Sequence, residues 1–424
     1  VLGHADPHRE VTLIDCLIAS NQLTLGDAPL NQKWRPARAL AGLHILDSTA
    51  NDFVSATVEL EGFHAWAGTG RFGITATPEA GDGRREVSVP QRRPIEFASS
   101  GWSFKVRHRV DPFRTRHHHD HSEVVSAQRT FIDISCDEAV PYDGFDSVVS
   151  ALADLASFAS RDACAIASYA VQHRVPQRRR RPVPGDNGSL RFDEYESPAH
   201  AEVFANWYTA PRTEGAPRPT RTYLFTASDL DLETLVTRWL EIRARLDRGI
   251  DMLLSLRYGE PTFLQTEVLV LAVAAEAIHR RLYPDCLLTY PGEFEHIRET
   301  AMAKLNAAER EMFDHTRNEL SYRDRLRDLA TLPVGLDKKS VGTVLPDLKK
   351  WVRDLTDVRN GLAHALTRRP STDDFELLVD MRRRTEHFIE ILILAELGLS
   401  AEVQRRALRQ RGYYVGFDDD RGSG

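Results

Sequence analysis

The spacing of apolar residues changes near residue 228, and this change limits the folds open to the chain. Before that point, short segments with β-branched and aromatic residues are separated by glycine-containing turns, a pattern typical of strands. After it, apolar residues recur at intervals of three and four, as on one face of a helix. We therefore predict the α+β class, with a β-rich, sandwich-like or barrel-like N-terminal domain followed by an all-α helical bundle. The predicted strand segments are 11–14, 53–60, 95–97, 102–106 and 129–134.

Length and local composition divide the chain into domains. At 424 residues it exceeds an ordinary single domain, so two are expected, each with its own core. The linker-like stretch Gly215–Pro219 places the boundary between about 210 and 228. The predicted parts are a domain over 1–220, with a helical segment near 145–173 and a basic linker near 174–190, a helical domain over 228–412, and a disordered tail over 413–424.

The C-terminal half predicts a series of helices. Ser228 followed by Asp231 has the form of a capping box, so the first helix is expected to begin there. The segment 262–282 is apolar on nearly all sides and is expected at the centre of the bundle. Ser371 with Asp374 is expected to open the last long helix, which ends near residue 397. The remaining helices are predicted at about 292–306 or beyond, at about 319–330 and from about 346 onward.

Charge, cysteines and hydropathy exclude several classes of protein. A net charge of −7 argues against coating nucleic acid through bulk charge, although local basic patches remain open. The cysteines at 16, 136, 164 and 286 match neither a zinc-ligand spacing nor a disulfide framework, which fits a reducing cytoplasm. The apolar run Val268–Ala275 is too short for a bilayer, and no signal peptide is found, although the chain starts at Val1. A cytoplasmic protein without a membrane partner is expected.

The segment Arg359-Asn360-Gly361-Leu362-Ala363-His364 carries the groups that a metal-free ribonuclease needs. Histidine exchanges protons near neutrality, and arginine stabilises the charge that builds on a phosphate under attack. On a continuous helix, Asn360 and His364 share a face, while Arg359 lies about 140° around from His364. Gly361 costs about 1 kcal/mol relative to Ala, so a helix that carries it here favours a site over stability alone.

The Arg-Asn-Gly-Leu-Ala-His segment resembles the Arg-x4–6-His signature of HEPN domains, in a variant with a polar Asn after the Arg. The whole chain is similar to ApeA-type antiphage proteins, including a feature such as Leu60-Glu61-Gly62-Phe63-His64-Ala65-Trp66 in its β-rich part. The resemblance implies a metal-independent endoribonuclease without a cofactor that acts in abortive infection. It also implies a homodimer formed through the HEPN helices, a composite RNA-binding cleft, and an N-terminal domain that senses a phage-derived trigger or restrains the nuclease.

The resemblance also implies a role for each residue of the motif. Cleavage would proceed by attack of the ribose 2′-OH on the adjacent phosphate. His364 would act as general base or acid, Arg359 as phosphate clamp and Asn360 as the residue that orients them. Arg368 and Arg369, just beyond the motif, are predicted to bind the RNA substrate. Glu276, His279 and Asp357 are candidates for supporting positions around the cleft.

Each of these assignments has a structural alternative. Arg359 could pair with Asp354 or Asp357 while His364 caps a carbonyl, in a non-catalytic HEPN-like scaffold or RNA-binding module. Glu276 could be a buried acid satisfied by an Arg or a Tyr.

Two charged runs in the N-terminal half have similar alternatives. The cluster Arg116-His117-His118-His119-Asp120-His121 could bind a metal, as in a metal-dependent hydrolase, but adjacent histidines in a loop are usually solvated. The run Arg178–Arg181 could contact RNA phosphates or be a solvated linker.

Overall fold

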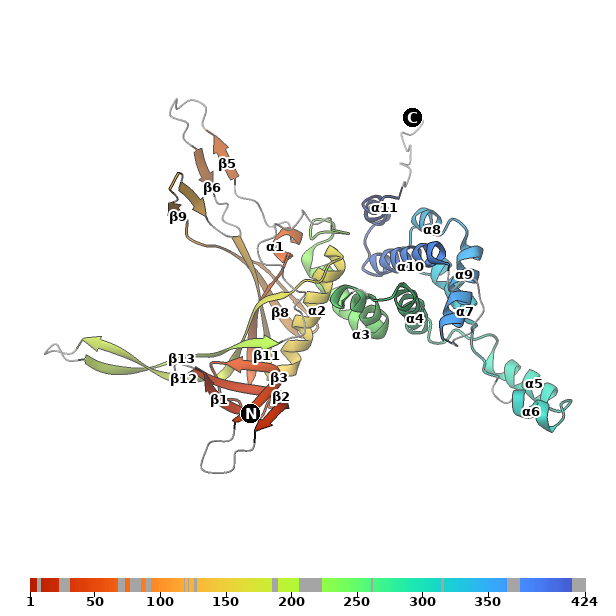
Figure 1. Cartoon of the computed structure of the whole chain (residues 1–424), viewed down its shortest axis with the longest axis horizontal. Coiled ribbons are helices and arrows are strands. Elements are labelled where there is room, and N and C mark those ends of the chain that lie inside the picture. The colour runs from red at the N-terminus through yellow and green to blue at the C-terminus, as the bar shows by residue number, and fades with distance from the viewer. Residues whose placement is uncertain are drawn as a thin grey trace. The chain divides into compact units, whose positions relative to one another are not determined.

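The computed structural model describes residues 1–5, 9–22, 31–67, 73–76, 85–88, 93–117, 119–120, 122–125, 128–184, 190–205, 223–260, 262–313, 316–363 and 374–413. The chain forms two compact units, Val1–Leu240 and Glu241–Gly424. The first is rich in strands and the second is helical (Figure 1), so the predicted α+β class is confirmed.

Nine strands of the first unit form one antiparallel sheet, in place of a sandwich or a closed sheet. In spatial order they are β1 (Leu2–Ala5), β2 (Arg9–Gln22), β3 (Asn31–Ala41), β13 (Leu190–Ala205), β12 (Ile166–Pro184), β4 (Phe53–Leu60), β11 (Gln128–Val140), β8 (Trp102–Val110) and β7 (Ile95–Ser99). Two further ribbons pair β5 (Gly73–Ala76) with β6 (Arg85–Ser88) and β9 (Arg114–His117) with β10 (Ser122–Val125). Each of the predicted strand segments lies within one of these strands.

The core of the first unit lies between the sheet and α2 (Tyr142–Ser160). From Ala56 onward alternate residues of β4, namely Ala56, Val58 and Leu60, are buried, as expected for a strand with one covered face. The helix α2 packs against β4 and β11 and is itself buried along most of its length, so it forms a central apolar layer. The short α1 (Phe63–Trp66) adds two buried aromatic side chains to this core.

The helical segment predicted near 145–173 is too long at its C-terminal end. The helix ends at Ser160, because Arg161 adopts a left-handed conformation with φ 59°, and the chain returns as β12 from Ile166.

The basic linker predicted near 174–190 is also wrong, because Arg178–Arg181 belong to strand β12. Acidic residues of β13 lie opposite three of these four arginines, and Arg180 pairs with Glu194 at 2.7 Å. Cross-strand pairs of opposite charge therefore stabilise a hairpin where the sequence suggested a loop.

The helices of the C-terminal half follow the predicted order, with two additions. They are α3 (Leu232–Tyr258), α4 (Leu264–Leu282), α5 (Pro291–Met302), α6 (Ala307–Phe313), α7 (Tyr322–Thr331), α8 (Lys338–Val344), α9 (Leu348–Ala363), α10 (Phe375–Glu396) and α11 (Ala401–Arg409). The helices α8 and α11 were not predicted, and the single helix predicted over 292–306 or beyond is divided into α5, which ends at Met302, and α6, which starts at Ala307. No helix in the described ranges combines the length and apolarity needed to cross a bilayer.

The helix α4 lies at the centre of the helical unit, as its apolar composition predicted. It packs against α10, α7 and α9, and its residues from Val268 to Ile278 include most of its buried side chains. A Cβ at Gly249 on α3 would lie 2.4 Å from Ile278 Cγ1, so a glycine is needed for the close approach of α3 to α4.

Two predicted helix caps differ in detail. Asp231, not Ser228, caps α3, because its carboxylate accepts a hydrogen bond from the Thr234 amide at 2.8 Å. Asp374 caps α10 in the same way by accepting from the Leu377 amide at 3.0 Å, whereas Ser371 lies outside the described residues. Both caps are aspartates one residue before the helix, where the negative carboxylate also interacts favourably with the positive end of the helix dipole.

Candidate functional site

The Arg-Asn-Gly-Leu-Ala-His segment falls at the end of α9. The helix continues through Gly361 to Ala363, and Arg359 and Asn360 lie in its last turns. His364, Arg368 and Arg369 lie outside the described residues. The structure therefore covers the segment from Arg359 to Ala363.

Three groups hold the Arg359 side chain. Its Nη2 donates to Glu276 Oε2 at 3.1 Å, and its Nη1 donates to Asn360 Oδ1 at 3.2 Å. The guanidinium also lies over the Tyr322 ring, 5.2 Å from its centroid. The Arg359 side chain keeps 30% of its surface exposed, so the cation is oriented without being sealed. We call Arg359, Asn360, Glu276 and Tyr322 the Arg359 cluster.

The cluster is assembled from three helices that pack on one another. Glu276 comes from α4, Tyr322 from the first turn of α7, and Arg359 with Asn360 from α9. The Tyr322 hydroxyl donates to the Ala272 carbonyl at 3.0 Å, which ties α7 to α4 and fixes the ring beneath the guanidinium. Burial raises the pKa of Tyr322 well above its ordinary value, so the ring remains a neutral phenol.

Ion pairs extend from the Arg359 cluster along α4 and α7. Glu276 also accepts from Arg280 at 3.1 Å, and Arg280 donates to Glu319 at 3.0 Å. Glu319 in turn accepts from Arg325 at 3.3 Å. Asp357 pairs with Arg323 at 3.3 Å. The sequence suggested Asp354 or Asp357 as the acidic partner of Arg359, and the structure pairs Arg359 with Glu276 of α4.

His279 and Glu276 are three residues apart on α4, but their side chains contact different residues. It is fully buried and faces Arg325 and Asp328 of α7. Arginine can only donate and a carboxylate can only accept, so the imidazole accepts from Arg325 at Nδ1 and donates from Nε2 to Asp328. Burial lowers the pKa of His279, which agrees with a neutral ring. His279 therefore joins α4 to α7 directly, and it is not part of the Arg359 cluster.

Sequence reasoning missed Tyr322, Arg280 and Arg323. None of them belongs to a motif. Tyr322 and Arg323 reach the site because α7 packs against α4 and α9, whereas Arg280 lies one turn from Glu276 on α4 itself. The helical spacing of α7 shows which of its residues share a face, but it does not show that this face meets α9. The start of α7 after the Ser321 cap was the one available signal for Tyr322.

The predicted basic and histidine runs lie elsewhere. His117 ends β9, His119 is exposed, and His118 and His121 lie outside the described residues. Within the described ranges, the one group of His, Cys and acidic side chains close enough to share a metal ion is His279, Cys286 and Asp328. The possibility of a metal at the histidine run therefore stays a hypothesis about residues that the structure covers only in part.

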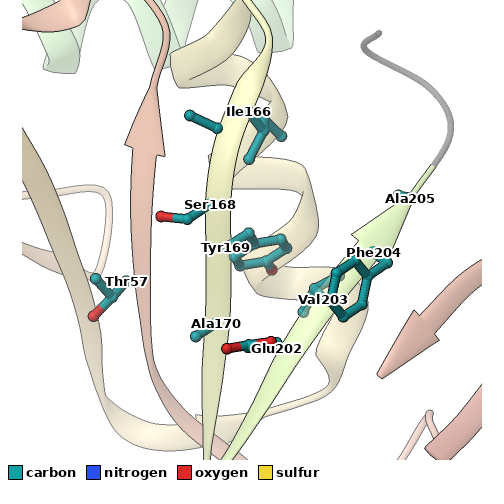
Figure 2. Close-up of a pocket in the computed structure, with 10 residues that line it drawn as sticks. Thr57, Ile166, Ser168, Tyr169, Ala170, Glu202, Val203, Phe204 and Ala205 are labelled. Atoms are coloured by element: carbon teal, nitrogen blue, oxygen red, sulfur yellow. The ribbon is translucent and has the colours of Figure 1, made fainter. Parts of the chain in front are cut away.

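A cavity of about 500 Å³ opens in the first unit where β12 and β13 diverge (Figure 2). The last cross-strand pair before the divergence is Ala170 with Glu202, and the strands beyond it pair with β4 and β3. Tyr169 lies in the gap, and the half-exposed Phe204 forms part of the opposite wall. The cavity is mainly apolar, with the polar groups of Ser168 and Glu202 at its margin.

Comparison with protein families assigns the helical unit: residues 269–403 match the Apea-like HEPN model, so the second unit carries a HEPN domain. Residues 1–239, more than half of the chain, match ApeA N-terminal domain 1. The chain therefore belongs to the ApeA family. No curated protein and no solved structure matches it significantly.

Proposed function

We propose that the chain is a metal-independent endoribonuclease that acts as an antiphage effector. HEPN domains are generally ribonucleases, and the family match gives the domain type. In the proposed reaction the ribose 2′-OH attacks the adjacent phosphate. His364 transfers the protons, Arg359 stabilises the charge on the phosphate and Asn360 orients the guanidinium. Arg368 and Arg369 contribute to RNA binding.

The observation that carries this proposal is the state of Arg359. The guanidinium is fixed by a carboxylate, an amide and an aromatic face, and yet remains 30% exposed. A phosphate clamp must keep donors available to the ligand, and the exposed part of the Arg359 side chain meets this requirement. Glu276 neutralises the cation in the absence of RNA, and a phosphate can take over part of that role.

The test is incubation of the purified chain with total RNA in the presence of EDTA, with His364→Ala as the comparison. We expect cleavage in EDTA that His364→Ala abolishes while the circular dichroism spectrum is unchanged. His296→Ala, an exposed histidine on α5, is the matched control and should cleave normally. Intact RNA under all conditions, including with phage lysate, would favour the alternative, a non-catalytic HEPN-like scaffold or an RNA-binding module.

A second part of the proposal is assembly. If Arg359 and His364 of two subunits converge on one cleft, the active species is a homodimer or a larger homo-oligomer. Sedimentation should then show a dimer, and the Arg359→Ala and His364→Ala proteins should each be inactive. A strictly monomeric protein with full activity would contradict a shared cleft.

We also propose that the N-terminal domain senses a phage-derived trigger or restrains the nuclease. The cavity between β12 and β13 gives a ligand room and an apolar lining in the described part of that domain. Ala170→Trp, which fills it from β12, should raise the amount of phage lysate needed for cleavage and leave basal cleavage unchanged. An unchanged response would remove the cavity from the proposal.

A further inference from the structure

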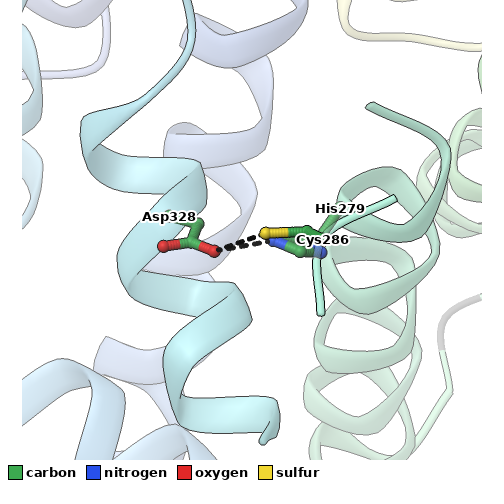
Figure 3. Close-up of side chains that lie close together, drawn as sticks. All are labelled: His279, Cys286 and Asp328. Carbon is green, nitrogen blue, oxygen red and sulfur yellow. Dashed lines mark hydrogen bonds and ion pairs between the residues drawn. The ribbon is translucent and has the colours of Figure 1, made fainter. Parts of the chain in front are cut away.

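His279, Cys286 and Asp328 bring three different metal-binding groups together in the helical unit (Figure 3). His279 lies near the end of α4, Cys286 in the turn that follows it, and Asp328 on α7. An imidazole, a thiol and a carboxylate form a ligand set typical of zinc, whereas calcium and magnesium prefer oxygen alone. The proposed ribonuclease activity makes no use of Cys286 or Asp328.

Two of the three distances between these groups are close to those of one tetrahedral ion. Zinc binds nitrogen and oxygen at about 2.0–2.2 Å and sulfur at about 2.3 Å, so two ligand atoms of a tetrahedral site lie roughly 3.3–3.7 Å apart. Asp328 Oδ2 lies 3.2 Å from His279 Nε2 and 3.8 Å from Cys286 Sγ. All three ligand atoms lie within 4.8 Å of one another. An ion could therefore be accepted with side-chain adjustments and without movement of the helices.

The three side chains differ in solvent exposure, and an ion needs an exposed side through which to enter the site. The His279 side chain has no exposed surface, whereas 25% of the Asp328 side chain is exposed and Cys286 is partly exposed. The carboxylate and the thiol thus face solvent while the imidazole closes the inner side. A water molecule can complete the coordination from the outer side.

Arg325 opposes binding in a defined way. Its Nη1 donates to His279 Nδ1 at 3.2 Å, so the imidazole proton stands on Nε2, where it meets Asp328. An ion on Nε2 requires that proton on Nδ1, which would then face another donor. Arg325 must give up this bond and keep its contact with Glu319 at 3.3 Å. Its charge also lies close to the ion, so the site is expected to be weaker than a dedicated structural zinc site.

We propose that His279, Cys286 and Asp328 form a zinc site with one water as the fourth ligand. Binding releases the thiol proton of Cys286 to solvent and moves the imidazole proton of His279 from Nε2 to Nδ1. The ion links α4, the turn after it and α7. This site is distinct from Arg359, and zinc takes no part in the proposed RNA cleavage.

The full chain, freed of metal, should be titrated with Co²⁺, which replaces zinc and reports a bound thiolate by an intense near-ultraviolet charge-transfer band. We expect the band at one equivalent, and Zn²⁺ should displace it. Cys286→Ser should remove the band, whereas Cys16→Ser, a matched change at a partly exposed cysteine of the other unit, should keep it. A missing band, or a band that survives in Cys286→Ser, would overturn the proposal.

Arg325→Gln provides a test that a simple loss of structure cannot imitate. The amide oxygen of glutamine can accept from Nδ1–H, and the opposing charge is gone, so Zn²⁺ should bind more tightly by about 10-fold or more. Arg327→Gln, an exposed change on the same helix, should leave the affinity unchanged. Weaker binding in Arg325→Gln with a folded protein would contradict the ligand geometry.

Alkylation of the unchanged protein covers the case in which a variant fails to fold. Zn²⁺ should protect Cys286 from iodoacetamide, as read by peptide mass spectrometry, and should leave the reaction of Cys16 unaffected. Equal alkylation of Cys286 with and without Zn²⁺ would exclude the thiol as a ligand. Each readout measures the ion or the thiol directly, so its result does not depend on ribonuclease activity.

Discussion

Two ionic clusters in the helical unit differ in exposure and, we infer, in purpose. The Arg359 cluster is partly open, with 30% of Arg359 and 17% of Glu276 exposed. The Glu390 cluster, defined as Glu390, Glu386, Arg257 and Arg411, has a closed interior, with only 2% of Glu390 and 5% of Arg257 exposed, whereas Arg411 at its edge keeps 24%. The first can exchange a protein carboxylate for a ligand phosphate, whereas solvent and ligands hardly reach the carboxylates of the second.

The pairing in the Glu390 cluster explains how two carboxylates one turn apart on α10 remain buried. Glu390 Oε1 accepts from Arg257 and from Arg411, each at 2.8 Å. Burial opposes its ionisation, but Arg411 and Arg257 outweigh burial and lower the pKa of Glu390. Burial and the neighbouring Glu390 instead raise the pKa of Glu386. The effect of such a cluster on stability is largest when one member is removed, because the remaining charges are then buried without a partner.

The largest expected effect is therefore on folding. Glu390→Gln keeps the shape of the side chain and removes the charge that Arg257 and Arg411 share, so we expect a loss of about 3–5 kcal/mol in the free energy of unfolding. Urea denaturation followed by circular dichroism measures it. Asp380→Asn, on the exposed side of the same helix, should cost less than about 1 kcal/mol. Equal losses in the two variants would erase the difference between a closed and an open cluster.

Arg359→Ala should show the opposite balance. Removing one fixed donor to a developing oxyanion costs about 100- to 1000-fold in rate, so RNA cleavage should fall by that factor. The free energy of unfolding should change by less than about 1 kcal/mol, since the ion pair is partly solvated. Arg353→Ala, an exposed arginine on the same helix paired with Asp354, is the control and should change neither quantity much. A large loss of stability with unchanged cleavage would make Arg359 a structural residue.

The sequence predicted the elements better than it predicted their contacts. Strand β4 and helix α4 follow from the spacing of their apolar residues, and both have one-sided or central burial as expected. The β12–β13 hairpin was missed because its arginine run reads as solvated when the acidic residues of the partner strand are not considered. Pairing between strands depends on register, and a local composition cannot supply the register.

The same limit applies to the site. Glu276 and His279 share one face of α4 by spacing, so both were predicted to support the cleft. In the structure Glu276 contacts Arg359, whereas His279 turns to Arg325 and Asp328. Tyr322, which carries no motif, lies beneath the guanidinium. Two residues on one helical face can thus meet different neighbouring helices, and only the packing of α4, α7 and α9 distinguishes them.

Glu276→Gln tests whether the open cluster positions the cation. The amide keeps a hydrogen-bonding oxygen near Arg359 but loses the charge that holds it, so we expect kcat to fall about 10-fold, which corresponds to about 1.4 kcal/mol, with little change in KM. Steady-state cleavage of a short labelled RNA measures both constants. Glu319→Gln, one step further along the ion pairs, should stay within about twofold. A rise in KM alone would instead assign Glu276 to substrate binding.

The smallest effect concerns pH and the buried end of the same ion-pair chain. Burial lowers the pKa of His279 from 6.5, so the unfolded chain binds a proton that the folded chain resists. The stabilising contribution of the neutral ring is present above about pH 6.5 and is lost as the pH falls through the lower folded pKa. Urea denaturation of the metal-free wild-type protein and of metal-free His279→Asn at about pH 7.5 and 5.5 isolates this contribution. The variant should lose less stability on acidification than the wild type, because Asn cannot take up the proton. A parallel loss in both proteins would mean that the folded and unfolded states take up the proton alike, so that the fold does not lower the pKa of His279.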